Sequence, residues 1–188
     1  MVDVAFVTTN PGKFREARTI LRPFGVRLRW VRRELNEPQS DDLGTVARSK
    51  ALGVRGLRGA VLVEDSGLFI PSLAGFPGVY SAHFLRIWGF RPILQLLRSR
   101  PRPAFYRSVA AVRMRGRCRT FVGEVHGRIA SRPVGENGFG YDPIFIPDGY
   151  RETFGQLPSE VKDTISHRAR SMAKVGKFLT TPPDGRSP

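Results

Sequence analysis

Several residue types are scarce in this sequence, and each shortage excludes a class of protein. Cys118 is the only cysteine among 188 residues, so an intrachain disulfide and a zinc site built from cysteines are both excluded. No apolar run approaches the roughly 20 residues that span a membrane. The first ten residues, M-V-D-V-A-F-V-T-T-N, lack the basic start of a secretion signal. We therefore expect a cytoplasmic protein with no membrane partner.

Acidic residues and lysines are also few. The chain has 16 Asp and Glu against 31 Lys and Arg, which gives a net charge of +15 and a pI near 11.3. Such an excess favours anionic partners: nucleic acid, phosphorylated small molecules or acidic surfaces. The cations are spread along the whole chain, which indicates a general use of Arg in place of Lys rather than a basic tail. The lysines are candidates for contacts that need a compact ammonium, such as contacts with phosphate; they are Lys13, Lys50, Lys162, Lys174 and Lys177.

The apolar pattern predicts a mixed sheet with helices in one domain, residues 1–180, followed by a disordered tail, 181–188. Alternating or continuous apolar segments predict strands at 2–8, 26–31, 61–63, 104–115 and 118–130. The last two are joined by a hairpin turn at Gly116-Arg117. Apolar residues at helical spacing predict helices at 13–21, 43–54, 90–98 and 166–178.

Two adjacent carboxylates, Glu64 and Asp65, follow the buried strand V-L-V at 61–63. Charged side chains are rarely buried unless they are paired or bind a metal ion. Carboxylates at the end of a strand can coordinate Mg²⁺ or act as general base for a water. The alternative is a turn or a helix cap made by Asp65-Ser66-Gly67. We expect the two carboxylates to hold a metal ion between themselves and a polyphosphate.

Three further clusters indicate an anion site. Residues 8–16, T-T-N-P-G-K-F-R-E, join a strand to a helix, where backbone N–H groups can bind an anion; the alternative is a solvated helix start capped by Asn10. Residues 136–145, E-N-G-F-G-Y-D-P-I-F, place aromatic residues between glycines, as a loop that stacks on a planar ligand would. Residues 162–168, K-D-T-I-S-H-R, put cations near a helix start, where the helix dipole disfavours them unless an anion binds there.

In order along the chain, six motifs resemble those of the inosine triphosphate pyrophosphatase family. They are T-T-N-P-G-K-F-x-E, L-N-E-P-Q, V-E-D-S-G-L, G-F-P-G-V-Y-S-A, G-F-G-Y-D-P-I-F and S-H-R-A, and the match covers residues 3–178. The resemblance implies an enzyme that hydrolyses ITP, dITP and XTP to the monophosphate and pyrophosphate with Mg²⁺, and so cleanses the nucleotide pool. It also implies a homodimer and an elongated mixed α/β sheet flanked by helices, with two lobes and a central nucleotide-binding cleft.

The resemblance also assigns roles to residues. Asp65 would be the catalytic base, with Glu64 as the alternative group that orients the water, and Glu37 and Asp65 would hold the metal ion. The residues that would bind the substrate are Thr8, Thr9, Asn10, Pro11, Gly12, Lys13, Lys50, Ser66, Phe139, Gly140, Tyr141, Asp142, Lys162, His167 and Arg168.

Two other functions are compatible with parts of the sequence. A nucleic-acid-binding module would explain the net charge, but it does not predict the acidic pair, which would repel phosphate unless a metal ion were present. We therefore expect no stable nucleic-acid partner. A hydrolase of modified pyrimidine triphosphates would use the same chemistry on another substrate, and a substrate panel separates the two enzymes.

Overall fold

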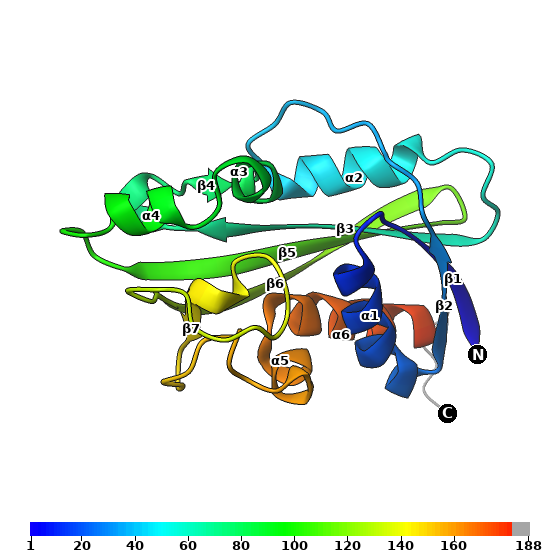
Figure 1. Cartoon of the computed structure of the whole chain (residues 1–188). Coiled ribbons are helices and arrows are strands. Elements are labelled where there is room, and N and C mark those ends of the chain that lie inside the picture. The colour runs from blue at the N-terminus through cyan, green and yellow to red at the C-terminus, as the bar shows by residue number, and fades with distance from the viewer. Residues whose placement is uncertain (182–188) are drawn as a thin grey trace.

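The structure is a computed structural model that describes residues 1–181. The predicted disordered tail, 181–188, lies outside the described residues except for Thr181. Figure 1 shows an elongated molecule in which a long twisted sheet lies between helices on both faces. Within residues 1–181, no helix is both long enough and apolar enough to cross a membrane.

Seven strands form one mixed sheet in the order β2-β1-β3-β5-β6-β7, with β4 paired to β3. The strands β1, β2 and β3 are parallel, and the remaining pairs are antiparallel. The bounds are β1 Val2–Val7, β2 Val26–Val31, β3 Ala60–Phe69, β4 Pro77–Gly78, β5 Pro103–Met114, β6 Arg117–Ile129 and β7 Phe145–Pro147. The predicted mixed α/β fold is confirmed.

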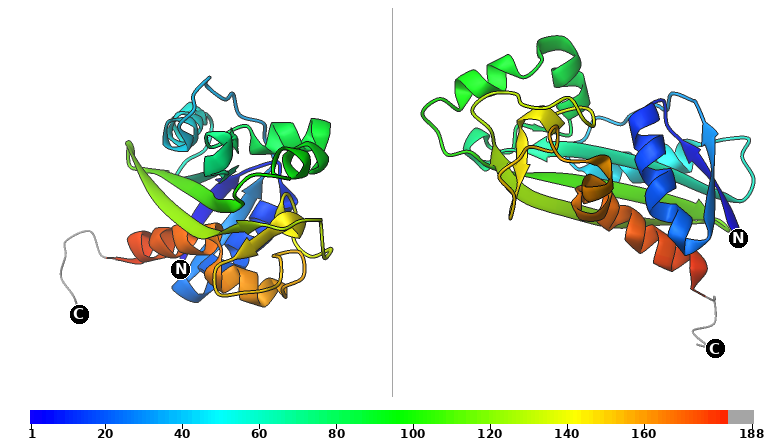
Figure 2. Two further views of the ribbon diagram at one scale, coloured as in Figure 1. Left: turned by 90° about the vertical axis from the view of Figure 1, so that its left-hand side faces the viewer. Right: turned by 60° about the horizontal axis from the view of Figure 1, so that its bottom comes forward.

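Six helices cover the sheet: α1 Pro11–Leu21, α2 Leu43–Gly53, α3 Ser81–Trp88, α4 Arg91–Leu96, α5 Ser159–Ile165 and α6 His167–Thr180. The buried apolar side chains of helices and strands form three clusters. One packs α1 and α6 on one face of the sheet, and a second packs α2 on the other face. The third lies at the far end, where α4, β7 and residues 141–157 meet. The views in Figure 2 show α2 and α6 on opposite faces of the sheet.

Two predicted elements differ from the structure, and the observed elements α3, α5, β4 and β7 were not predicted. The strand predicted at 61–63 does not end at Glu64 but continues to Phe69. The hairpin turn lies at Arg115-Gly116, one residue earlier than predicted, and both residues have positive φ (51° and 72°), as a two-residue hairpin turn requires. Helix α5 was not predicted, because its seven mostly polar residues carry little apolar periodicity.

Candidate active site

Strand β3 separates its two adjacent carboxylates, because neighbouring residues of a strand point to opposite faces of the sheet. Glu64 points toward α6, where it meets Ser108 and Arg168. Asp65 points toward α2, where it meets Lys50. The geometry therefore does not support the expectation that both carboxylates hold one metal ion, since Glu64 contacts Ser108 and Arg168 whereas Asp65 contacts Lys50.

Glu64 belongs to a buried ion cluster. Its carboxylate accepts hydrogen bonds from Ser108 Oγ at 2.7 Å and Arg168 Nη2 at 3.1 Å, and Lys13 Nζ lies 2.9 Å from Oε2. Burial alone would raise the pKa of Glu64, but the charges of Arg168 and Lys13 hold it well below its ordinary value. A carboxylate engaged in this way is not free to orient a water, so the geometry favours Asp65 as the base.

Asp65 and Glu37 share a cation. Lys50 Nζ lies 2.8 Å from Asp65 Oδ1 and 2.7 Å from Glu37 Oε1, and Asp65 Oδ2 is buried without a hydrogen-bond partner. The two carboxylates thus already converge on one positive group, which is the arrangement that Mg²⁺ would need. Within residues 1–181, no group of three His, Cys, Asp or Glu side chains could hold a metal ion. Substrate oxygens would have to complete the coordination.

The start of α1 is closed to anions at two backbone donors. Asn10 caps the helix, and its Oδ1 accepts hydrogen bonds from the backbone N–H groups of Gly12 and Lys13 at 2.8 and 3.1 Å. The capping alternative is therefore confirmed, and these two N–H groups are not free for phosphate. Gly12 instead provides space, since a Cβ placed on it would lie 2.5 Å from the ring of Phe139.

The cations of residues 162–168 are balanced by protein carboxylates. Lys162 Nζ lies 2.8 Å from Glu16 and also contacts Asp142, and Arg168 Nη1 lies 2.5 Å from Glu16. Burial would raise the pKa of Glu16, yet Arg168 and Lys162 hold it below its ordinary value. The expectation that these cations need a bound anion is therefore wrong, because Glu16, Glu64 and Asp142 already neutralise them.

Glu16 was not predicted as a site residue. It stands three residues after Lys13 in the first motif, so both side chains lie on one side of α1. That spacing was the available signal. What the sequence could not show is that the partners of Glu16 come from α5 and α6, more than 140 residues away.

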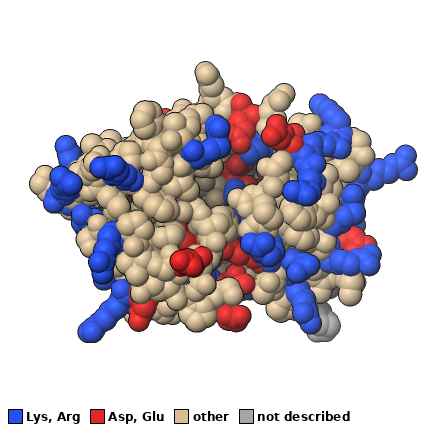
Figure 3. All heavy atoms as spheres, in the orientation of Figure 1, with Lys and Arg blue, Asp and Glu red and all other residues tan. Residues whose placement is uncertain are grey.

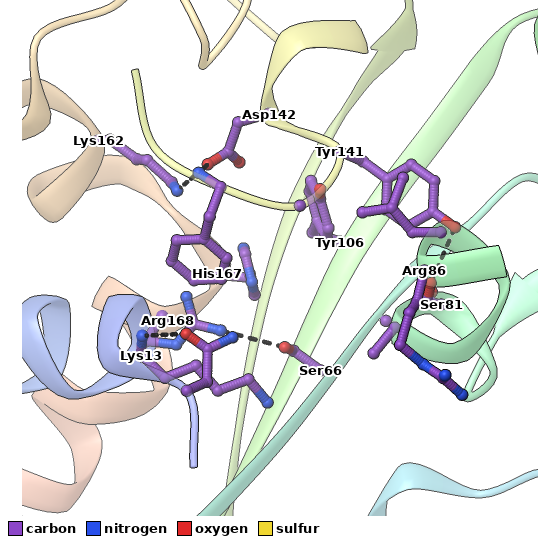
Figure 4. A pocket seen from close by; sticks show the side chains of 16 residues that line it. Lys13, Ser66, Ser81, Arg86, Tyr106, Tyr141, Asp142, Lys162, His167 and Arg168 are labelled. Carbon is purple, nitrogen blue, oxygen red and sulfur yellow. Dashed lines mark hydrogen bonds and ion pairs between the residues drawn. The ribbon is translucent and has the colours of Figure 1, made fainter. Parts of the chain in front are cut away.

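Aromatic side chains enclose a cavity of about 320 Å³ beside this cluster (Figure 4). Tyr106 stacks on His167 with ring centroids 4.5 Å apart, and Tyr141 donates a hydrogen bond to the carbonyl of Ser81. Burial and the charge of Arg168 hold the pKa of His167 well below its ordinary value, so its ring is neutral at pH 7. The cavity is therefore suited to a flat, uncharged ring.

Two cations lie over a further aromatic ring of the cavity. Lys162 Nζ is 4.7 Å and Arg168 Cζ is 5.3 Å from the centroid of Phe139. Cations over a ring face are attracted by its quadrupole. Arg168 Nε is buried and has no acceptor among residues 1–181. Sequence reasoning missed Ser81, Arg86 and Tyr106 as lining residues, although Ser81 stands in the motif G-F-P-G-V-Y-S-A, which was the available signal.

A second cavity of about 370 Å³ adjoins the aromatic cavity, and Asn10, Lys13 and Ala82 line both. The structure thus brings together fifteen of the seventeen predicted residues. Those at the aromatic cavity are Asn10, Lys13, Ser66, Phe139, Gly140, Tyr141, Asp142, Lys162, His167 and Arg168. Those at the second cavity are Thr8, Thr9, Asn10, Lys13, Glu37, Lys50 and Asp65. Pro11 and Gly12 line neither.

Comparisons of the sequence and the fold with known proteins show what the chain is similar to. The model of the Ham1 family matches residues 4–178. The chain is 43% identical over 179 residues to the dITP/XTP pyrophosphatase of Thermococcus kodakarensis, a match that covers 94% of this chain and 96% of that protein. It is 42% identical, with the same coverage of both chains, to the dITP/XTP pyrophosphatase of Pyrobaculum aerophilum. A HAM1 protein from Coxiella burnetii has a similar structure, with a TM-score of 0.82, 27% identity and coverage of 96% of this chain and 99% of that one.

Proposed function

Because the chain belongs to the Ham1 family, we propose that it hydrolyses ITP, dITP and XTP to the monophosphate and pyrophosphate, and so cleanses the pool of non-standard purine nucleotides. One observation carries this function. A single cleft has an aromatic cavity at one end and, at the other, the lysines and carboxylates that a triphosphate with its metal ion requires. The enzyme is thus a hydrolase of phosphoric anhydride bonds.

Mg²⁺ would be held by Glu37 and Asp65 together with phosphate oxygens of the substrate. The convergence of both carboxylates on Lys50 supports this assignment. Bound there, the metal ion would neutralise phosphate charge and polarise the anhydride. Side chains of the protein would perform the remaining steps.

Asp65 would take the proton of the attacking water through Oδ2, the oxygen that Lys50 does not contact. The water oxygen forms a bond to phosphorus, and the anhydride bond to pyrophosphate breaks. Lys13 stands where the two cavities meet, so its ammonium would stabilise the negative charge that develops on the phosphates. Ser66 would contact the substrate from the aromatic side.

Selection of the base would depend on unpaired donors in the aromatic cavity. The free Nε–H of Arg168 would donate to a 6-keto group, whereas a 6-amino group would face it with another donor. A ligand that leaves a buried polar group unpaired loses binding on the order of several kcal/mol. Adenine nucleotides would be rejected on this basis, while Phe139 and Tyr141 would stack on any purine.

The direct test is a substrate panel with Mg²⁺ and equal concentrations of ITP, XTP, GTP, ATP, dUTP and dTTP, with pyrophosphate assayed separately from phosphate. We expect pyrophosphate from ITP and XTP and little from GTP or ATP. If pyrophosphate is released mainly from a pyrimidine triphosphate, the proposed reaction is right and the proposed substrate is wrong. No product from any nucleotide would overturn the enzyme and favour a nucleic-acid-binding module.

Replacement of the base gives a second test. Asp65→Asn removes the proton acceptor but keeps the shape and one hydrogen-bond acceptor, so we expect turnover of ITP to fall by about three orders of magnitude or more. Circular dichroism should remain unchanged, because Asp65 contacts Lys50 and no core side chain. A variant that keeps most of its activity would refute Asp65 as the base.

We further propose that the enzyme is a homodimer and works in the cytoplasm, where the nucleotide pool lies. Exposed apolar side chains on and before α3 support an interface with a second copy: Tyr80, Ile87 and Trp88 are 58%, 50% and 62% exposed. Light scattering coupled to size exclusion measures the mass directly. A mass of one chain of 21.0 kDa at all concentrations would exclude the dimer.

A further inference from the structure

Lys50 occupies the place that a metal ion would take between Glu37 and Asp65. Its side chain extends from α2, is 12% exposed, and ends 2.7 and 2.8 Å from the two carboxylate oxygens. Mg²⁺ binds oxygen at about 2.0–2.1 Å. A metal ion within reach of both oxygens would therefore overlap the ammonium group, and the two cations cannot be bound there together.

The ammonium of Lys50 is a positive charge held between two carboxylates. Among the described residues, the hydrogen bonds of Lys50 Nζ go only to these two carboxylates. Release of Lys50 therefore leaves a positive charge that needs a new partner.

A bound triphosphate would supply that partner, since the further cations that line the cavity, Lys13 and Arg33, outnumber its one further exposed carboxylate, Glu34. Lys50 lines the same cavity as Thr8, Asn10 and Lys13, and its flexible four-carbon stem allows the ammonium to move within that cavity. Without a nucleotide, the displaced Lys50 would share the cavity with the ammonium of Lys13 and a divalent cation, and like charges repel. With a triphosphate present, both ammonium groups gain phosphate oxygens.

We propose that Lys50 is an internal competitor for the metal site, which keeps the site closed to free divalent cations and opens it to a cation that arrives with a nucleoside triphosphate. This inference rests on the proposed function, because it takes Glu37 and Asp65 as metal ligands. It gives Lys50 two successive positions, first between the carboxylates and then on the phosphates. Binding of metal and nucleotide is therefore strongly coupled.

The test measures Mn²⁺ binding to the full chain without nucleotide, from the loss of the free Mn²⁺ signal in electron paramagnetic resonance. Mn²⁺ accepts the same oxygen ligands as Mg²⁺. We expect Lys50→Gln to bind Mn²⁺ about tenfold more tightly than the unmodified protein, or better, because the competing charge is gone. Lys50→Arg keeps the charge and should stay weak. Lys177→Gln, which removes an exposed lysine of α6, is the matched control and should also stay weak.

A second measurement needs no variant. The unmodified protein should bind Mn²⁺ about tenfold more tightly when an excess of non-hydrolysable ITP analogue is present, after correction for Mn²⁺ on the analogue itself. Suppose that Lys50→Gln binds Mn²⁺ no more tightly than the unmodified protein, and that the unmodified protein hydrolyses ITP with Mg²⁺. The competitor role is then wrong, and the proposed function stands. If Mn²⁺ is not bound even with the analogue and no substrate is hydrolysed, both are wrong.

Discussion

At the scale of single residues, Glu64 and Asp65 are neighbours in sequence and belong to different parts of the protein. Glu64 is fully buried and neutralises Lys13 and Arg168, whose side chains are 16% and 1% exposed. Asp65 is reached from the cleft and pairs with one lysine. Loss of the charge of Glu64 should lower the stability of the fold, whereas loss of the charge of Asp65 should lower turnover.

We predict that Glu64→Gln destabilises the fold by roughly 3 kcal/mol, since breaking a buried ion pair leaves uncompensated charge. Urea denaturation measures this loss. Asp65→Asn, one residue along the same strand, is the control and should cost less, because Lys50 keeps Glu37 as a partner. Equal stability of the two variants would show that the ion cluster around Arg168 does not depend on Glu64.

A carboxylate beside the site should make stability depend on pH. Burial and the charge of Glu16 raise the pKa of Asp163 to about 6. Since folding raises this pKa, folding favours the protonated form, and stability falls as the pH rises from about 4 to about 6.

Asp163→Asn should remove that loss. We expect its melting temperature to exceed that of the unmodified protein by about 2–4 °C at pH 8, which corresponds to about 1 kcal/mol after allowance for partial exposure, with no difference at pH 4. Differential scanning calorimetry at both pH values provides the measurement. Asp148→Asn, at an exposed carboxylate after β7, should show no such dependence. A gain at pH 4 equal to that at pH 8 would contradict the assignment.

At the scale of elements, the site depends on how closely the start of α1 approaches the loop before β7. Gly12 allows this approach, because a Cβ there would lie 2.5 and 2.7 Å from two carbons of the Phe139 ring. Phe139 in turn lies under Lys162 and Arg168. A single methyl group on α1 would therefore shift an aromatic wall of the cavity.

We predict that Gly12→Ala raises the KM for ITP about tenfold while the fold survives, because Ala is favoured over Gly in a helix by about 1 kcal/mol. Steady-state kinetics and a melting curve measure the two effects. Gly53→Ala, at the end of α2 where a Cβ meets open space, is the matched control and should leave KM unchanged. A normal KM in Gly12→Ala would mean that Phe139 does not contact the substrate.

The elements that the sequence predicted well are those whose packing is apolar. Four predicted helices and the two long strands of the hairpin are present within a few residues of the expected bounds. The apolar pattern predicts strand β3 only as far as Val63, because charged residues follow, whereas the strand continues to Phe69. Glu64 remains in the strand because Arg168, 104 residues further along the chain, neutralises it there. Such partners cannot be read from a local pattern.

The site was predicted in outline for a related reason. Short motifs named fifteen of the residues that line the two cavities. They gave no account of how the charges balance, because Glu16, Lys162 and Arg168 meet only after three helices pack together. Tyr106 was missed because it lies within a strand whose pattern explains it as a core residue.

At the scale of the whole molecule, charge is unevenly distributed. On the face drawn in Figure 3, Lys and Arg lie mainly around the margin, whereas Asp and Glu gather toward the middle. Five carboxylates at the cleft are each paired with a cation: Glu16, Glu37, Glu64, Asp65 and Asp142. The net charge of +15 is therefore carried largely by exposed arginines, which attract anions from a distance without contacting the substrate.

We predict that kcat/KM for ITP falls several-fold between roughly 50 and 500 mM KCl, because salt screens long-range attraction over about 10 Å or less. The kcat should remain constant, since the ion pairs of Glu16, Glu64 and Asp142 are buried. Kinetics at a series of salt concentrations with fixed free Mg²⁺ test this. A fall in kcat with unchanged kcat/KM would place the salt-sensitive charges in the chemical step instead.

The alternation of β3 also has a consequence for inheritance. A substitution in this strand changes one side chain, but loss of a single codon within positions 60–63 would turn every later residue of the strand to the opposite face. Asp65 would then replace Glu64 against Arg168, and the cleft would present Ser66 to Lys50. During evolution, substitutions in this strand should therefore be tolerated far more often than changes in its length.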